Sequence, residues 1–337
     1  RAPIRTAMST ATQPLRAAPP APPSPLRAPG TPPHEAPPHG APPSGQVIAG
    51  DSRLVRYLNL VKFPHTLFAL PFALVGVVAA SRVAPVTPRL VLLVVVAFTA
   101  ARWVGVGVNM IADRRWDALN PRNQRRELPR GALTVAEATR SVVVAGAIFL
   151  AAAWAINPLC GLLAPLALAW VTGYSFAKRF TFWPHLWLGL GLAIAPVGGW
   201  LAIVGRWSSP AWTLCALALA VTCWVGGFDM LYALPDERFD RAHGLRSAVV
   251  RLGVPGALRL ARALHLVTVP LLAAFGLGAG AGPLWFAGVV VAAALLAWEH
   301  TLVRADDLSR LDAAFFRMNA VLSCTVFAFA LADLLLR

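Results

Sequence analysis

The sequence contains few charged residues, and acidic residues are the scarcer type. Only 13% of its 337 residues are Asp, Glu, Lys or Arg, about half the share that is usual in soluble domains. A soluble globular protein needs many charged side chains to cover its surface, so this scarcity argues against a water-soluble protein. Hydrophobic residues make up 57% of the chain, and its mean hydropathy is +0.62. The composition therefore predicts a membrane protein.

Cysteine is also scarce, and the fingerprints of several soluble enzyme classes are missing. The four cysteines are scattered through apolar stretches and form no C-x-x-C pair. This spacing gives no reason to expect a disulfide framework or cysteine metal ligands. The sequence contains no Walker loop, dinucleotide-binding glycine fingerprint or Ser-His-Asp arrangement.

Positive charges, by contrast, are in excess. The chain has 30 Lys and Arg against 15 Asp and Glu, which gives a formal net charge of +15. In a soluble protein such an excess would suggest nucleic-acid binding. Here the basic residues lie beside long apolar runs, so the positive-inside rule of membrane proteins explains them better, and we expect no nucleic-acid partner.

Residues 1–50 differ in composition from the rest of the chain. Fourteen of the 29 prolines lie there, mixed with Ala, Ser, Gly and a few Arg. Such a segment buries too little apolar surface to offset its ordering entropy, so we expect a disordered leader over residues 1–50. It has no uninterrupted apolar stretch of the kind found in secretory signal peptides. We expect one membrane domain over residues 51–337.

From Phe63 onward, long apolar runs alternate with short charged segments. A helix that spans a bilayer needs about 20 apolar residues. We count nine candidates, centred near residues 72, 98, 145, 168, 195, 221, 264, 293 and 324. The sequence thus predicts an all-α, polytopic membrane protein with nine transmembrane helices.

The loops between these spans differ in charge from one side to the other. The loop after the second span holds six arginines, and further basic residues follow the fourth, sixth and eighth spans. Because cytoplasmic loops are enriched in Lys and Arg, we expect these loops and the N-terminus in the cytoplasm. The predicted location is a bacterial-type inner (plasma) membrane.

A first polar motif, Asn109-x-x-x-Asp113-x-x-x-Asp117, lies at the predicted cytoplasmic end of the second span. Steps of four residues keep the three side chains on one helical face. Two carboxylates one turn apart repel each other unless they are screened. A divalent cation would screen them, and a solvated helix end paired with arginines is the structural alternative.

A second motif, with Asp229, Asp236 and Asp240, follows the sixth span in the run FDMLYALPDERFD. Steps of seven and four return to one face if the helix continues, although Pro235 can kink or end it. Asp229 lies within the apolar run, where an acid indicates function by default, with a hydrogen-bonded structural acid as the alternative. Both motifs lie on the same predicted membrane face. Together, their carboxylates would bind two Mg²⁺ ions and, through them, a diphosphate with a long lipid tail.

Three basic residues near these motifs are candidate contacts for anionic substrates. Lys178 follows Tyr174 by one turn at the end of the fourth span, where it would either hold a departing diphosphate or serve as a positive-inside anchor beside an interfacial tyrosine. Arg102 lies seven residues before Asn109 in an apolar run, and a buried arginine needs an anionic partner, either an aspartate or a substrate carboxylate. Lys62 opens the first span; alone it is explained as an interfacial residue, and beside these motifs it joins the substrate-binding candidates.

Over residues 53 to about 335 the sequence resembles the UbiA family of intramembrane prenyltransferases. The two aspartate motifs carry the resemblance, together with Tyr174-x-x-x-Lys178. The stretches VKFPHTLFALPFAL, NPRNQRRELPRG and FDMLYALPDERFDRAHGLRS are similar to the 4-hydroxybenzoate polyprenyltransferase branch, and a menaquinone-pathway branch shares them. Two positions depart from the family pattern: Met110 stands where we expect a basic residue, and Ala248-Val249 where we expect an apolar–proline pair.

The resemblance implies nine transmembrane helices around a central cavity, capped by the loops that bear the aspartates. The implied Mg²⁺ ligands are four carboxylates, which with Lys178 are the predicted catalytic residues: Asp113, Asp117, Asp236 and Asp240. Asn109 and Lys178 would contact the diphosphate, and Tyr174 would line the cavity. Arg102, Lys62 and Asp229 complete the predicted substrate-binding set.

The implied reaction is the Mg²⁺-dependent transfer of a polyprenyl chain from polyprenyl diphosphate to an aromatic acid of the 4-hydroxybenzoate type, in quinone biosynthesis. The implied partners are these two substrates and the lipid bilayer. Within the family, a dihydroxynaphthoate-type ring of menaquinone synthesis is the alternative acceptor. An ion-coupled transporter is an alternative of another class, although its charged residues would lie near mid-membrane rather than at helix ends.

Overall fold

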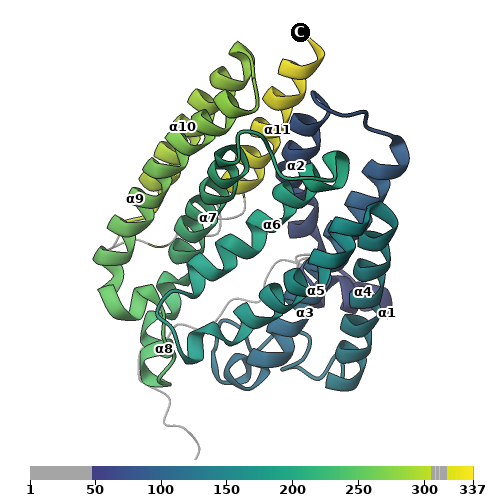
Figure 1. Cartoon of the computed structure of the whole chain (residues 1–337). Coiled ribbons are helices and arrows are strands. Elements are labelled where there is room, and N and C mark those ends of the chain that lie inside the picture. The colour runs from purple at the N-terminus through teal and green to yellow at the C-terminus, as the bar shows by residue number, and fades with distance from the viewer. Residues whose placement is uncertain (1–47, 305–307, 309–310, 312–316, 337) are drawn as a thin grey trace, which may run out of the picture. The chain divides into compact units, whose positions relative to one another are not determined.

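The structure, a computed structural model, describes residues 48–304, 308, 311 and 317–336. The predicted disordered leader lies outside the described residues, apart from residues 48–50. The described part of the chain is helical and contains no strand, which confirms the all-α prediction (Figure 1). Its elements are α1 (Arg53–Leu60), α2 (Phe63–Ala80), α3 (Pro88–Leu119), α4 (Val135–Ile156), α5 (Pro158–Gly173), η1 (Tyr174–Arg179), α6 (Pro184–Val204), α7 (Trp212–Ala233), η2 (Leu234–Asp236), α8 (Glu237–Ala242), α9 (Ala248–Gly278), α10 (Pro283–Leu302) and α11 (Asn319–Leu335).

The helix lengths agree with a polytopic membrane protein. Within the described residues, eight helical segments are long and apolar enough to cross a membrane. The shorter apolar helix α11, with 17 residues, coincides with the ninth predicted span. The polytopic prediction is confirmed, with a last helix somewhat shorter than the others.

Side-chain caps fix where several of these helices begin. Thr134 and Glu137 form a capping box at the start of α4, in which the Thr134 hydroxyl accepts from the Glu137 N–H and the Glu137 carboxylate accepts from the Thr134 N–H. Asn157 caps α5 through the N–H of Cys160, and Ser247 caps α9 through the N–H of Val250. Each cap satisfies an N–H that a helix leaves without an internal partner, so these polar residues separate consecutive spans.

Helix α7 lies at the centre of the packing. It packs against α6 on one side and α9 on the other, and α2 contacts both α6 and α11. The largest apolar cluster includes Leu214, Leu217 and Val225 of α7, which are fully buried. At Gly76, α2 approaches α6 so closely that a Cβ would overlap the backbone oxygen of Pro196. Small residues allow such close helix approach in membrane bundles.

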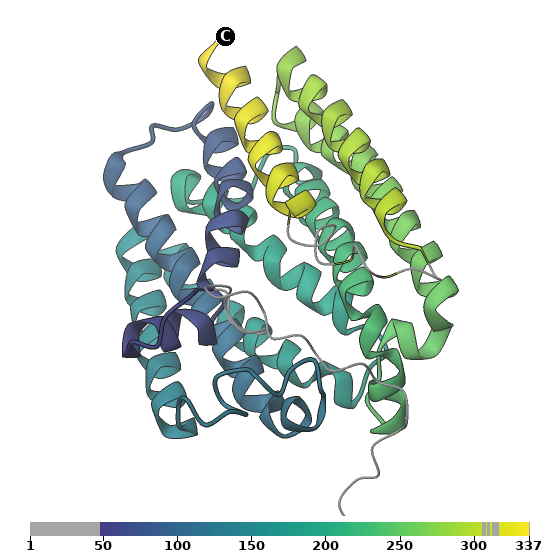
Figure 2. The ribbon, with the colours of Figure 1, turned by 180° about the vertical axis from the view of Figure 1, so that it is seen from behind.

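The two ends of the membrane domain differ in what they carry. In both views the turn between α9 and α10 lies at the upper end with the C-terminus, while α8 and the loop after α3 lie at the lower end (Figures 1 and 2). The two aspartate motifs therefore lie at the same end, as predicted, since they occupy the last turns of α3 and the segment from η2 into α8.

Candidate active site

The first motif occupies the last turns of α3. Asn109 donates from its side-chain amide to Asp113 Oδ2 over 3.0 Å, one turn away on the same face. Asp117 is 4% exposed, and Arg126 Nη1 lies 2.9 Å from each of its carboxylate oxygens. The spacing thus brings the three side chains to one helical face, as predicted, with an arginine from the following loop against the last of them.

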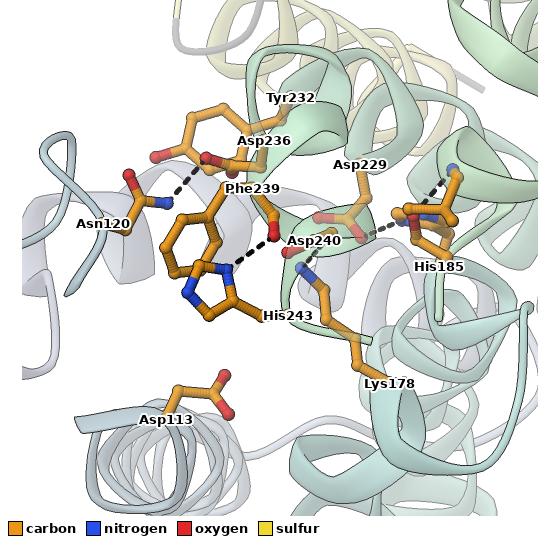
Figure 3. Close-up of polar contacts among 12 residues, drawn as sticks. Asp113, Asn120, Lys178, His185, Asp229, Tyr232, Asp236, Phe239, Asp240 and His243 are labelled. Atoms are coloured by element: carbon orange, nitrogen blue, oxygen red, sulfur yellow. Dashed lines mark hydrogen bonds and ion pairs between the residues drawn. The ribbon is translucent and has the colours of Figure 1, made fainter. Parts of the chain in front are cut away.

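The second motif lies where α7 ends. Pro235 stands in the short 3₁₀ turn η2, which separates α7 from α8, so the helix does not continue through the motif. Arg122 Nη1 lies 3.0 Å from Asp236 Oδ2, and the Asn120 amide donates to Asp236 Oδ1 over 3.1 Å (Figure 3). Asn120 and Arg122 belong to the loop after α3, which directly follows the first motif. This loop therefore binds the second motif through Asp236.

Lys178 links the two motifs. Its ammonium lies 3.0 Å from Asp240 Oδ2, and the charges of Asp236 and Asp113 also act on it. Asp113 points from α3 toward the side of the site that carries Asp236 and Asp240 (Figure 3). The Lys178 carbonyl accepts from the N–H of Arg246 over 2.7 Å, which fixes η1 against the segment that follows α8. The predicted lysine and the two pairs of aspartates therefore share one site.

Lys62 lies at the edge of the same site, at the N-cap of α2. Its backbone has φ 49°, a left-handed conformation that is rare for a side chain other than glycine. Its ammonium lies 5.8 Å from the centre of the Tyr232 ring, and the Arg122 guanidinium lies 4.3 Å from the same centre. Burial lowers the pKa of Lys62, and the Tyr232 hydroxyl partly opposes this shift. Lys62 also adjoins a cavity of about 10 Å³ that Asp117 and Arg126 line.

The remaining predicted residues lie on the membrane side of the motifs. Arg102 donates from Nε to the Thr66 hydroxyl over 3.3 Å and forms no ion pair with any described residue. The charges of Arg102, Asp113 and Asp229 act on the Tyr174 hydroxyl. Of the two partners expected for Arg102, an aspartate or a substrate carboxylate, the described structure does not show an aspartate.

Asp229 is paired with a histidine that the sequence analysis did not single out. Its Oδ2 lies 2.7 Å from Nδ1 of His185, which comes from the first turn of α6 and is 1% exposed (Figure 3). The Asp229 side chain itself is 23% exposed. This carboxylate is thus both hydrogen-bonded and accessible. A purely structural role explains the hydrogen bond to His185 but not the exposed part of the carboxylate.

Four site residues, His185 among them, were missed by sequence reasoning. Asn120, Arg122 and Arg126 lie in the run NPRNQRR, whose arginines were interpreted only as loop charge and as part of the resemblance. Their position in one short loop directly after the first motif was the available signal. His185 had no signal, because a single histidine in an apolar run says nothing of its partner on another helix.

The charges at the site are balanced by ion pairs. Arg126 holds Asp117, Arg122 holds Asp236, and Lys178 holds Asp240. Burial alone would lower the pKa of Arg126, but the Asp117 carboxylate, together with Tyr232 and Asp236, outweighs it, so the pKa of this guanidinium lies above its usual value. Among the described residues, Asp113 is the motif aspartate with no ion pair.

The donor set fits a hard divalent cation. Within the described ranges, no three His, Cys, Asp or Glu side chains are gathered in the manner of a preformed metal cage. Apart from Asp229, the two motifs supply four carboxylates and the Asn109 amide, all oxygen donors of the kind that Mg²⁺ prefers. Mg²⁺ is usually held by one or two carboxylates together with substrate phosphates rather than by a protein cage alone, so this arrangement is suited to an ion that arrives with its substrate.

Comparison with known proteins gives the family. Residues 69–321 match the model of the UbiA prenyltransferase family. The chain belongs to the UbiA prenyltransferase family. It is 30% identical over 274 residues to a 4-hydroxybenzoate octaprenyltransferase of Aromatoleum aromaticum, covering 80% of this chain and 91% of the relative. It is 29% identical over 304 residues to the enzyme of the same name from Nitrosospira multiformis, covering 85% and 98%.

Solved structures agree with this UbiA membership. The apo structure of a UbiA homologue from Aeropyrum pernix K1 matches with a TM-score of 0.73 at 33% identity, covering 80% of this chain and 98% of that one. A UbiA homologue from Archaeoglobus fulgidus, solved with GPP and Mg²⁺ bound, shares the fold with a TM-score of 0.59 at 22% identity, covering 82% and 99%. This UbiA chain is thus a prenyltransferase and an integral membrane protein, which decides against the transporter alternative.

Proposed function

We propose that this UbiA chain transfers a polyprenyl group from a polyprenyl diphosphate to an aromatic acid of the 4-hydroxybenzoate type, with Mg²⁺, in quinone biosynthesis. The observation that carries the proposal is the convergence of both aspartate motifs on Lys178 at one end of a membrane bundle. The curated relatives described above are named for this reaction, and a family homologue binds a prenyl diphosphate with Mg²⁺.

The four motif aspartates are the proposed ligands of Mg²⁺: Asp113, Asp117, Asp236 and Asp240. When bound, the ions would neutralise the charge of the departing diphosphate. Asn109 and Lys178 would donate to diphosphate oxygens from the two facing sides of the site. Charge stabilisation of this kind, by groups already in place, is usually the largest single contribution to catalysis.

The three ion pairs of the site would hold its carboxylates in place before the metal ions and the substrate bind. Each of Arg122, Arg126 and Lys178 lies about 3 Å from the carboxylate that it holds. When those carboxylates bind Mg²⁺, the two arginines and the lysine would become free to donate hydrogen bonds to phosphate oxygens. The planar guanidinium of arginine matches phosphate geometry well. The site would thus exchange these three ion pairs for contacts between the cations, the carboxylates and the diphosphate.

The acceptor would lie deeper in the bundle, next to Arg102, Tyr174 and Asp229. Arg102 has no carboxylate partner in the described structure, so it is available for the carboxylate of the aromatic acid. Asp229, oriented by His185, would accept a hydrogen bond from the acceptor's hydroxyl group. The diphosphate would leave with the electrons of the allylic C–O bond, the aromatic carbon would attack the allylic cation, and the proton on that carbon would pass to the diphosphate. The apolar walls of the bundle would keep water from the cation.

The orientation in the membrane follows from the basic loops. Because the arginine-rich loops lie at the end that carries the aspartates, we place this end and the N-terminus in the cytoplasm of a bacterial-type cell, in the inner membrane. Lys62 would bind near the diphosphate, at the membrane surface.

An assay that offers two acceptors tests the proposal. Purified protein in nanodiscs receives one labelled polyprenyl diphosphate, Mg²⁺, and equal amounts of 4-hydroxybenzoate and a dihydroxynaphthoate. We expect the labelled chain on the benzoate. Arg206→Gln, an exposed change at the opposite end of the bundle, serves as control and keeps wild-type activity. Transfer to the naphthoate alone would move the enzyme to menaquinone synthesis, and no transfer to either ring would refute the proposed reaction.

A further inference from the structure

A groove on the outside of α3 lies apart from the aspartate site. It has a volume of about 470 Å³ and is lined by α3, α4 and η1. Arg115 of α3 lines it, and Arg115 is two residues from both Asp113 and Asp117. Two residues correspond to about 200° around a helix, so the groove is on the opposite face of α3 from these carboxylates. We call this feature the arginine groove.

Among the described residues, three arginines and no acidic residue line the arginine groove. Arg114, Arg115 and Arg179 form no ion pair within the described part of the chain. Two of them are held by backbone oxygens: Arg114 donates to the Ile111 carbonyl over 2.7 Å, and Arg179 donates to the Ala112 carbonyl over 3.1 Å. A carbonyl oxygen orients a guanidinium but does not neutralise it. The groove therefore keeps a net positive charge, of which the Arg179 part also acts on Asp113 of the aspartate site.

Aromatic rings fix the position of Arg179 in the groove. The Arg179 guanidinium lies 4.9 Å from the centre of the Trp116 ring and 4.7 Å from the centre of the Phe176 ring. Stacking of this kind leaves the edge of the guanidinium, with its N–H donors, free to bind an anion. Arg114 and Arg179 are therefore held in place by the protein, whereas Arg115 is exposed beside them.

The rest of the lining is apolar and includes Val108, Ile111 and Val142. These residues belong to the ends of membrane-spanning helices, so the groove runs from the level of the lipid head groups toward the hydrocarbon core. A small soluble anion would use the arginines and leave the apolar wall in contact with water. A molecule with a phosphate at one end and a hydrocarbon chain at the other would cover both.

We propose that the arginine groove binds an anionic phospholipid of the surrounding membrane. Its phosphate would accept from Arg114, Arg115 and Arg179, and its acyl chain would lie against Val108 and Val142. The volume of about 470 Å³ lies within the range of about 300–1,000 Å³ that is usual for small-molecule sites. Basic pockets between membrane helices on the cytoplasmic side are suited to lipid head groups.

The site would also act on the enzyme through η1. Arg179 follows Lys178 directly, and Lys178 holds Asp240 at the aspartate site. A lipid phosphate on Arg179 would fix η1 against α3 and so fix the position of Lys178. This consequence rests on the proposed prenyl transfer, whereas the binding of lipid does not.

Native mass spectrometry of the detergent-solubilised full chain tests the binding. The protein is titrated with phosphatidylglycerol, with phosphatidylcholine of the same acyl chains, and with inorganic phosphate. Basic residues near a membrane surface attract anionic lipid. Allowing for partial exposure, we expect the first phosphatidylglycerol to bind about tenfold more tightly than phosphatidylcholine, and inorganic phosphate not to displace it.

Variants assign that preference to the groove. Replacing Arg114, Arg115 and Arg179 by Gln together removes the tenfold preference, and Arg115→Gln alone reduces it to about threefold in a protein that keeps its thermal stability. The matched control loses the same charge at three exposed arginines elsewhere, Arg89, Arg206 and Arg259, and keeps the preference. An unchanged preference in the triple Gln variant, or in Arg115→Gln if the triple variant does not fold, overturns the proposal. Equal binding of both lipids, or displacement by phosphate, overturns it as well.

Discussion

Two aspartate-to-asparagine changes, one in each motif, separate metal binding from structural pairing. Asp113 accepts from Asn109 and has no ion pair among the described residues, whereas Asp240 is buried and holds Lys178. Asn keeps the size of either side chain and removes its charge. Asp113→Asn therefore removes a proposed metal ligand and leaves no cation unpaired. Asp240→Asn removes a proposed metal ligand and also leaves Lys178 without its ion-pair partner.

The structure sets the size of each effect. Breaking a buried ion pair by removing one partner costs about 3–5 kcal/mol. The Lys178 side chain is 33% exposed, and two further aspartates act on its charge, so we expect Asp240→Asn to cost about 2 kcal/mol. That corresponds to a fall of about 5 °C in Tm. Asp113→Asn should cost less than about 0.5 kcal/mol, because no charge is left unpaired.

Activity should respond differently from stability. Removal of one group that stabilises transition-state charge costs about 3 kcal/mol, or a factor of about 100 in rate. We expect both variants to lose about 100-fold in kcat/KM, and Asp113→Asn to do so with a wild-type Tm. Thermal unfolding in detergent and transfer from labelled polyprenyl diphosphate in membranes measure the two quantities. Full activity of Asp113→Asn at saturating Mg²⁺, or a loss of stability equal to that of Asp240→Asn, would refute the reasoning.

Three further predictions follow from single features of the structure. Chelation by EDTA should abolish transfer, restored by Mg²⁺, while changing Tm by less than about 2 °C because three cations still hold their carboxylates; a collapse of Tm would contradict this. Arg102→Leu should raise KM for the aromatic acid about tenfold and leave KM for the prenyl diphosphate unchanged in steady-state kinetics, and equal increases in both would remove Arg102 from the acceptor site. Gly76→Ala should lower Tm by the equivalent of about 1–3 kcal/mol, since its Cβ would overlap the backbone oxygen of Pro196, whereas Gly198→Ala in the same helix pair has open space and should not; equal Tm values would show that α2 and α6 separate freely.

The membrane class and the aspartate motifs could be predicted from the sequence because both depend on local pattern. A run of about 20 apolar residues has few alternatives to a membrane helix. A spacing of four residues places Asn109, Asp113 and Asp117 on one face of any α-helix, and the structure has them so. The arrangement of the second motif was harder to predict from the sequence. Pro235 follows the end of α7, and the motif continues through a 3₁₀ turn into α8.

What only the tertiary structure decided is which charge meets which. The sequence by itself determined a helical membrane protein with two acidic motifs at one end. It did not determine that Arg122 and Asn120 reach across to Asp236, that Lys178 holds Asp240, or that His185 meets Asp229. The physical reason is that ion pairs form between side chains that packing brings within about 3–4 Å, and that packing joins helices far apart in the chain. The arginine groove has the same origin, since its arginines come from α3 and η1 and its apolar wall is completed by α4.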